Sequence, residues 1–154
     1  GCLAPLAAEV VGVAQSAGTR AGFPVVTAAE LPDILPSTDV LVNILPATPE
    51  TAGIVDADIL AQLPRKAWLV NVGRGATVDE AALRTALWDG VIAGAALDVT
   101  AAEPLPVDDP IWDAPNLIHT PHSAGGRPQG SEALIEANLT ALRAGEPLRN
   151  TVSR

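Results

Sequence analysis

Short apolar segments alternate with longer segments of helical periodicity along this chain. The apolar segments are rich in β-branched side chains and cover residues 9–13, 23–26, 40–45, 67–72, 93–99 and 117–119. The segments with helical spacing cover residues 28–35, 56–63, 78–88 and 128–144. Strands that are apolar throughout are typical of parallel sheets with both faces covered. The alternation therefore predicts an α/β fold, a doubly wound parallel sheet of Rossmann type.

Polar residues follow three of the predicted strands. Arg74 comes after strand 67–72, Glu103 after strand 93–99 and His122 after strand 117–119. The carboxyl ends of parallel strands meet at one edge of a sheet, where open α/β proteins bind their ligands. We therefore expect these three side chains to form one site.

Arg74 stands between Gly73 and Gly75, and this segment has two interpretations. It resembles a degenerate GxGxxG dinucleotide-binding fingerprint, with Asp98 as the ribose-binding acid further along the chain. In the second interpretation, the two glycines let the backbone turn so that the Arg74 guanidinium forms a fork for a carboxylate. Val78 in place of the third glycine favours the second interpretation. A solvated surface arginine is the third alternative.

His122 and Glu103 are candidates for proton transfer. His119 lies within a predicted strand and is expected to pack there, whereas His122 leaves the strand after Pro121, which keeps the preceding backbone extended. An imidazole that titrates near neutral pH is a common general acid, and a neighbouring carboxylate holds its tautomer and charge. Glu103 is the nearest candidate for that carboxylate, although it could equally be an ordinary loop acid.

Composition restricts the partners of this domain. The 154 residues are 48% hydrophobic and 18% charged, and nine Lys and Arg against eighteen Asp and Glu give a net charge of −9. This charge argues against binding to nucleic acid or anionic membranes through bulk electrostatics. The single cysteine, Cys2, excludes an intrachain disulfide and fits a reducing compartment, so we expect a cytoplasmic location. No metal site and no membrane span are expected.

Several motifs together resemble the D-isomer-specific 2-hydroxyacid dehydrogenases. They are Val-Asn-Val-Gly-Arg-Gly-Ala-Thr-Val-Asp-Glu at 70–80, Ala-Ala-Leu-Asp-Val at 95–99, Glu-Pro-Leu-Pro at 103–106, Thr-Pro-His-Ser-Ala at 120–124 and Leu-Pro-Ala-Thr-Pro-Glu-Thr at 45–51. The similarity covers roughly residues 9–154. Within the family, the loop 98–106 and the tail 145–150 are most similar to glyoxylate/hydroxypyruvate reductases.

The resemblance implies an oxidoreductase that transfers a hydride between NAD(P)H and a small 2-keto or D-2-hydroxy acid. Arg74 would bind the substrate carboxylate and carbonyl, His122 would be the general acid and base, and Glu103 would pair with His122. Asp98 would lie near the nicotinamide rather than the ribose. The other residues that the resemblance places along the cofactor cleft are Leu45, Pro46, Val72, Gly73, Ser123 and Ala124.

The choice between NADP and NAD is expected at the end of strand 9–13. An NAD-preferring relative would carry an acid there for the ribose hydroxyls. This chain has no acid between residues 14 and 20 and instead offers Gln15, Ser16 and Arg20. Since Arg20 can bind a 2′-phosphate, NADP is favoured over NAD.

The resemblance also predicts the domain organisation. Residues 1–125 would form an N-terminally incomplete dinucleotide-binding domain, because no GxGxxG stands before strand 9–13. Residues 126–154 would form a helix and tail that return toward a substrate domain absent from this chain. Exposed apolar faces on such a piece predict a homodimer or another partner. A truncated, non-catalytic nucleotide-binding or interaction module is the alternative function.

Overall fold

The computed structural model describes residues 9–126 and 129–151. The chain divides into two compact units, Gly1–His122 and Ser123–Arg154. Cys2 and the expected helix start at residue 128 lie outside the described residues. The division after His122 lies three residues before the boundary expected from the sequence.

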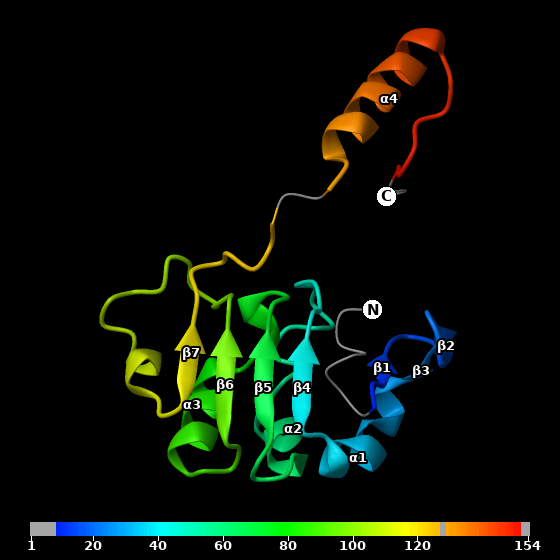
Figure 1. Ribbon diagram of the computed structural model, residues 1–154. Helices are drawn as coiled ribbons and strands as arrows, with labels where there is room; N and C mark the ends of the chain where they lie inside the picture. The colour runs from blue at the N-terminus through cyan, green and yellow to red at the C-terminus, as the bar shows by residue number, and fades with distance from the viewer. Residues whose placement is uncertain (1–8, 127–128, 152–154) are drawn as a thin grey trace. The chain divides into compact units, whose positions relative to one another are not determined.

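A four-stranded parallel sheet forms the centre of the first unit. Its strands are β4 (Val40–Asn43), β5 (Trp68–Asn71), β6 (Gly94–Leu97) and β7 (Leu117–His119), and they lie in that order (Figure 1). All three pairings are parallel, which confirms the predicted Rossmann-type sheet. β7 has the predicted bounds, whereas β4, β5 and β6 end one or two residues earlier than predicted, where the chain turns into the loops that follow them.

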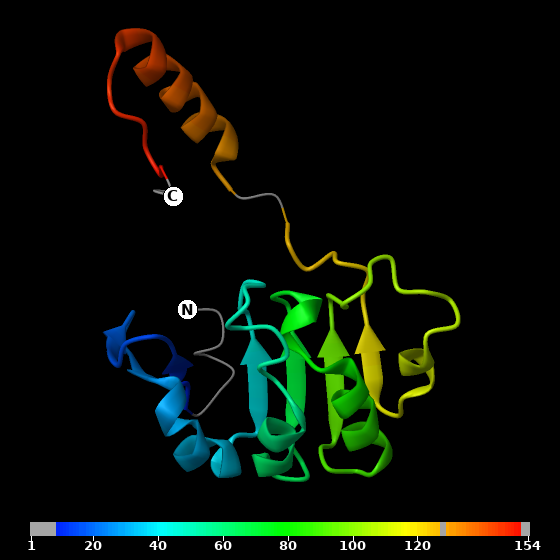
Figure 2. The ribbon, with the colours of Figure 1, turned by 180° about the vertical axis from the view of Figure 1, so that it is seen from behind.

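Two helices cover one face of this sheet and enclose the core. They are α2 (Ala57–Gln62) and α3 (Glu80–Trp88), and both views show them on the same side (Figures 1 and 2). The row of paired residues that faces the core includes Leu41, Leu69, Ala95 and Leu117. On the neighbouring row, Val42 is 37% exposed and Ile118 is 56% exposed. An apolar sheet face is therefore left open within the described residues.

A small second sheet precedes the main one. Strands β1 (Gly12–Val13) and β3 (Phe23–Val26) are parallel, and β2 (Gly18–Arg20) pairs antiparallel with β3. The sequence prediction missed β2 and made the first strand too long. The reason is local: Ala21 and Gly22 both have positive φ, 52° and 85°, which is the two-residue turn that favours a hairpin.

The predicted helices are found with one change. Segment 28–35 is not one helix but a 3-10 turn (Ala28–Glu30), α1 (Leu31–Ile34) and another 3-10 turn (Leu35–Ser37), because Pro32 and Pro36 interrupt it. Asp79 is the N-cap of α3, and its Oδ1 accepts a hydrogen bond of 3.0 Å from the backbone N–H of Ala82. Short 3-10 turns also occur at Gly75–Thr77 and Pro110–Asp113.

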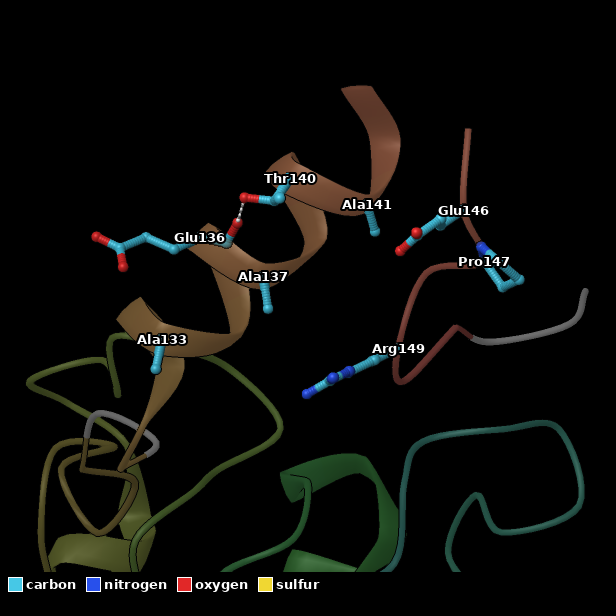
Figure 3. Close-up of a pocket in the computed structure, with 8 residues that line it drawn as sticks. All are labelled: Ala133, Glu136, Ala137, Thr140, Ala141, Glu146, Pro147 and Arg149. Atoms are coloured by element: carbon cyan, nitrogen blue, oxygen red, sulfur yellow. Dashed lines mark hydrogen bonds between the residues drawn. The ribbon is translucent and has the colours of Figure 1, made fainter. Parts of the chain in front are cut away.

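The second unit is one helix and a tail. Helix α4 (Ser131–Ala144) ends at Gly145, whose φ of 71° is the left-handed cap geometry that glycine favours. The Asn138 side chain fastens the tail, since its Oδ1 accepts from Arg149 N–H at 2.9 Å and its Nδ2 donates to Arg149 O at 3.2 Å. Figure 3 shows the hollow between helix and tail, lined by small side chains such as Ala137. In the described part of the chain, no helix is long and apolar enough to cross a membrane.

Leu69 tests the core between the sheet and its helices. It is fully buried in the middle of β5, so Leu69→Ala should lower the free energy of unfolding by about 2–5 kcal/mol. Val107, which is 97% exposed, is the control, and Val107→Ala should change the free energy of unfolding by less than about 0.5 kcal/mol. Urea unfolding followed by circular dichroism measures both. Equal effects of the two substitutions would contradict this assignment of the core.

Candidate active site

A buried polar cluster holds the loop that carries Arg74. Asn43, Asn71 and Thr77 are all buried at the carboxyl edge of the sheet. The Asn43 Nδ2 donates to Asn71 Oδ1 at 3.2 Å and to Thr77 Oγ1 at 2.6 Å. Asn71 Nδ2 and Thr77 Oγ1 both donate to the carbonyl of Arg74, at 3.2 and 2.6 Å. Two side-chain donors on one carbonyl fix the backbone at Arg74.

Gly73 and Gly75 allow close contact between neighbouring backbones. A Cβ on Gly73 would lie 2.7 Å from the backbone N of Leu45, and one on Gly75 would lie 1.9 Å from the backbone C of Thr100. Any side chain at either position would therefore collide with the next loop. This argues against the fingerprint interpretation, in which the glycines make room for a pyrophosphate.

The Arg74 side chain is exposed at this edge. Its Nη1 donates to the carbonyl of Gly73 at 2.7 Å, which directs the guanidinium along its own loop. Hydrogen bonds from His122 and Thr100 are the main causes that lower the pKa of Glu103, and the Arg74 charge adds the smallest contribution. The structure thus brings Arg74 into the neighbourhood of the two other predicted groups.

His122 and Glu103 form a direct pair. His122 Nδ1 lies 2.7 Å from Glu103 Oε2, and the backbone N–H of Thr100 donates to Glu103 Oε1 at 3.1 Å. The hydrogen bond from His122 is the main cause that lowers the pKa of Glu103, followed by that from Thr100. Glu103 therefore stays ionised below its ordinary titration range and can hold a positive imidazole.

The backbone of His122 is held at a special conformation. Its φ is 52°, in the left-handed region, and its N–H donates to the carbonyl of Asp98 at 2.8 Å. Asp98 is buried and its Oδ1 accepts a hydrogen bond of 2.5 Å from Thr120 Oγ1. A non-glycine residue with positive φ is uncommon and is often found at functional sites.

A hollow of about 310 Å³ lies beside the His122–Glu103 pair. Asp98, Leu105 and His119 are among its lining residues. As expected, His119 packs within the fold, with its ring against Trp112 at a centroid distance of 4.9 Å and an angle of 78°. Among the described residues, no group of three potential metal ligands is found.

The predicted nucleotide-binding residues lie in separate parts of the chain. Arg20 Nη2 donates to Ser16 Oγ at 3.0 Å, beside the exposed Gln15, in the segment that follows β1. Leu45 N–H donates to Asn43 Oδ1 at 3.1 Å, which ties the 45–46 turn to the cluster beneath Arg74.

Four further predicted cofactor residues lie in two places, Pro46 and Val72 in the first unit and Ser123 and Ala124 in the second. Pro46 and Val72 are exposed at the ends of β4 and β5. Ser123 and Ala124 belong to the second unit.

The sequence reasoning missed Asn43, Asn71 and Thr77. For Asn43 and Asn71 the signal is a polar residue at the last position of an otherwise apolar strand, as in Val-Leu-Val-Asn and Trp-Leu-Val-Asn, whereas Thr77 lies in the 3-10 turn Gly75–Thr77. A buried amide at that place needs partners, and the following loop supplies them.

The parallel sheet with a site at its carboxyl edge defines a Rossmann-type nucleotide-binding domain. Residues 1–124 match the family described as D-isomer specific 2-hydroxyacid dehydrogenase, NAD binding domain. The chain belongs to this family, which confirms the resemblance seen in the motifs.

Known relatives and solved structures agree with this assignment. The chain is 43% identical over 127 residues to glyoxylate/hydroxypyruvate reductase A of Klebsiella pneumoniae (strain 342), covering 82% of this chain and 41% of the relative. It also superposes on an NADPH-dependent glyoxylate/hydroxypyruvate reductase from Sinorhizobium meliloti in complex with NADP and sulfate. There the TM-score is 0.87 and the identity 35%, over 99% of this chain and 50% of the other.

A third similar protein is a D-isomer specific 2-hydroxyacid dehydrogenase from Xanthobacter autotrophicus Py2 in complex with NADPH and MES. The TM-score is 0.83 and the identity 41%, covering 94% of this chain and 61% of the other. The chain thus spans about two fifths of the length of the curated relative.

Thr77 tests the polar cluster. Thr77→Val keeps the shape of the side chain but leaves the Arg74 carbonyl and Asn43 with one partner fewer. It should lower the free energy of unfolding by about 1–3 kcal/mol and speed hydrogen exchange at Gly73 and Gly75. The control is Thr85→Val on the exposed side of α3, which should cost less than about 0.5 kcal/mol. Unchanged exchange in Thr77→Val would refute the role of the cluster.

Proposed function

We propose that the protein containing this chain is an oxidoreductase that transfers a hydride between NADPH and a small 2-keto acid of the glyoxylate or hydroxypyruvate type. The observation that carries the proposal is the 2.7 Å pair of His122 and Glu103 at the carboxyl edge of the sheet, the edge at which Arg74 follows β5. Relatives that bear the name glyoxylate/hydroxypyruvate reductase support the substrate class. Residues 1–125 would form the cofactor part and residues 126–154 the returning helix and tail.

The residues after β1 fit NADP. Arg20 and Ser16 form a hydrogen-bonded pair of a cation and a hydroxyl, which suits the 2′-phosphate of the cofactor. Gln15 would lie at the same end of the cofactor. The rest of the cofactor cleft would be lined by Leu45, Pro46, Val72, Gly73, Asp98, Ser123 and Ala124. When bound, NADPH supplies the hydride that reduces the substrate.

Arg74, His122 and Glu103 then have different roles toward the substrate. The Arg74 guanidinium holds the carboxylate of the keto acid and orients its carbonyl. His122 donates the proton from Nε2 to the carbonyl oxygen as negative charge develops there. Glu103 accepts a hydrogen bond from Nδ1 of His122, which fixes the imidazole ring and stabilises its positive form before the proton is transferred. In the oxidative direction His122 takes the proton from the hydroxyl group.

We also propose a homodimer in the cytoplasm. The exposed Ile135, Leu139 and Leu142 follow one another along α4 at helical spacing and offer an apolar surface for association. The single cysteine fits a reducing compartment. Light scattering of the purified protein measures its mass in solution, and a monomer would refute the dimer.

Arg74 is the sharpest test of the reaction. In the intact protein, Arg74→Ala should lower kcat/KM for glyoxylate about 10²–10³-fold, because a charged donor to the reacting group is lost. Arg74→Lys keeps the positive charge but not the forked pair of donors, and it should recover only part of the lost kcat/KM. NADPH consumption measures the rates. Near-normal kinetics in Arg74→Ala would refute the role of Arg74. NADPH binding without turnover in the unmutated protein would instead favour the non-catalytic nucleotide-binding module.

Arg20 tests the cofactor preference. Arg20→Ala should raise the KM for NADPH about 10–100-fold and leave that for NADH unchanged, because a hydrogen bond between charged groups contributes about 1.5–3 kcal/mol. Arg65→Ala is the control, since it removes the same charge elsewhere. Arg65 precedes β5, at the edge of the main sheet opposite the carboxyl edge that carries the candidate site. Equal affinity of the unmutated protein for both cofactors would refute the preference for NADP.

A further inference from the structure

Glu80, the first residue of α3, reaches a segment far away in the sequence. Its Oε1 accepts a hydrogen bond of 2.7 Å from the backbone N–H of Ala101. Ala101 lies between β6 and Glu103, in the loop that carries half of the His122–Glu103 pair. The proposed mechanism gives Glu80 no role.

The loop from Thr100 to Glu103 is a compact turn. Thr100 N–H donates to Glu103 Oε1 at 3.1 Å, and Thr100 Oγ1 donates to the carbonyl of Ala102 at 2.8 Å. The other carboxylate oxygen of Glu103 binds His122. A shift of the backbone at Thr100 and Ala101 would therefore move the carboxylate away from the imidazole.

The same loop lies directly against the segment that follows Arg74. A Cβ on Gly75 would be 1.9 Å from the backbone C of Thr100 and 2.4 Å from the backbone N of Ala101. Five residues after Gly75, Glu80 binds that same N–H of Ala101. One stretch of chain thus holds the loop at two points, by close packing and by a hydrogen bond.

We infer that Glu80 is a positioning residue, which holds the Thr100–Glu103 loop against the Arg74 segment and so fixes Glu103 relative to both His122 and Arg74. The inference rests on the proposed roles of these three residues. It adds a group that touches neither substrate nor cofactor and acts through the backbone of Ala101.

Capping of α3 does not account for Glu80. Asp79 already caps the helix through Ala82 N–H. Burial raises the pKa of Glu80, and the nearby charge of Asp109 raises it further, whereas the hydrogen bond from Ala101 and the charge of His119 lower it. A partly buried carboxylate next to another acid is unfavourable, and the bond to Ala101 is the contact that offsets this cost.

The experiment compares Glu80→Ala, Glu80→Gln and Asp79→Ala in the intact protein. We expect Glu80→Ala to lower kcat for glyoxylate about 10–100-fold, since small displacements of catalytic groups have effects of this size, with little change in the KM for NADPH. In carbon-13 NMR titrations the pKa of Glu103 should move up toward its ordinary value, because its contact with His122 is weakened. Glu80→Gln keeps an oxygen that accepts the hydrogen bond from Ala101 N–H. In this variant kcat and the pKa of Glu103 should therefore both stay near the values of the unmutated protein.

Asp79→Ala is the matched control at the same helix end. It removes the cap of α3 without touching the Thr100–Glu103 loop, so kcat and the Glu103 titration should stay at the unmutated values. The inference is overturned if Glu80→Ala leaves both unchanged, or if Asp79→Ala changes them equally. If Glu80→Ala does not fold, Glu80→Asp replaces it, and an unchanged Glu103 titration there overturns the inference.

The Glu103 titration does not depend on activity. If the unmutated protein reduces no keto acid, the proposed function fails, while the titration still decides whether Glu80 positions Glu103.

Discussion

The amide of Asn71 is the interaction on which the candidate site depends. This buried side chain receives a hydrogen bond from Asn43, accepts another from Gly73 N–H at 3.1 Å, and donates to the Arg74 carbonyl. It therefore links two neighbouring strand ends to the loop that carries the guanidinium. In the described part of the chain, every buried side-chain nitrogen or oxygen has such a partner. A fully satisfied polar cluster is rigid, because moving any member leaves a desolvated group unpaired.

Rigidity at β5 extends across the sheet edge to the two later loops. The backbone of Gly75 packs directly against the backbone of Thr100, and the Glu80 carboxylate accepts a hydrogen bond from the N–H of Ala101. The loop thus fixed carries Glu103 to His122. Parallel pairing of β5, β6 and β7 brings these three loops to one edge, so groups far apart in the sequence are held at hydrogen-bond distance. Such pre-organisation is what the proposed hydride and proton transfer to one small substrate would require.

The acidic character of the chain shapes how an anion could be bound. A net charge of −9 repels anions at long range. Capture of a carboxylate or a phosphate must therefore rely on single cations at short range. Arg74 at the edge of the main sheet and Arg20 at the end of β2 are the cations proposed for these roles, and Arg20 donates a hydrogen bond to Ser16. An acidic protein can bind anionic ligands in this way without binding polyanions in general.

Much of the fold could be predicted from the sequence because it follows from local signals. The apolar runs predicted all four strands of the main sheet, and the helical spacing over 78–88 predicted α3. The rule that strand ends meet at one edge was enough to select Arg74, Glu103 and His122 together. The hairpin at Ala21 and Gly22 was missed, since an alanine with positive φ carries no signal in the sequence. The helical spacing of residues 28–35 predicted one helix, which Pro32 and Pro36 interrupt.

The sequence by itself determined the class of sheet, the family and the residues that carry charge at its edge. These depend on periodicity and on motifs that can be read along one chain. Only the tertiary structure decided how those residues are held. It paired Asn43 with Thr77 and Glu80 with Ala101, contacts that span 34 and 21 residues. Hydrogen bonds of this kind depend on which loops meet in space, and sequence spacing contains no measure of that distance.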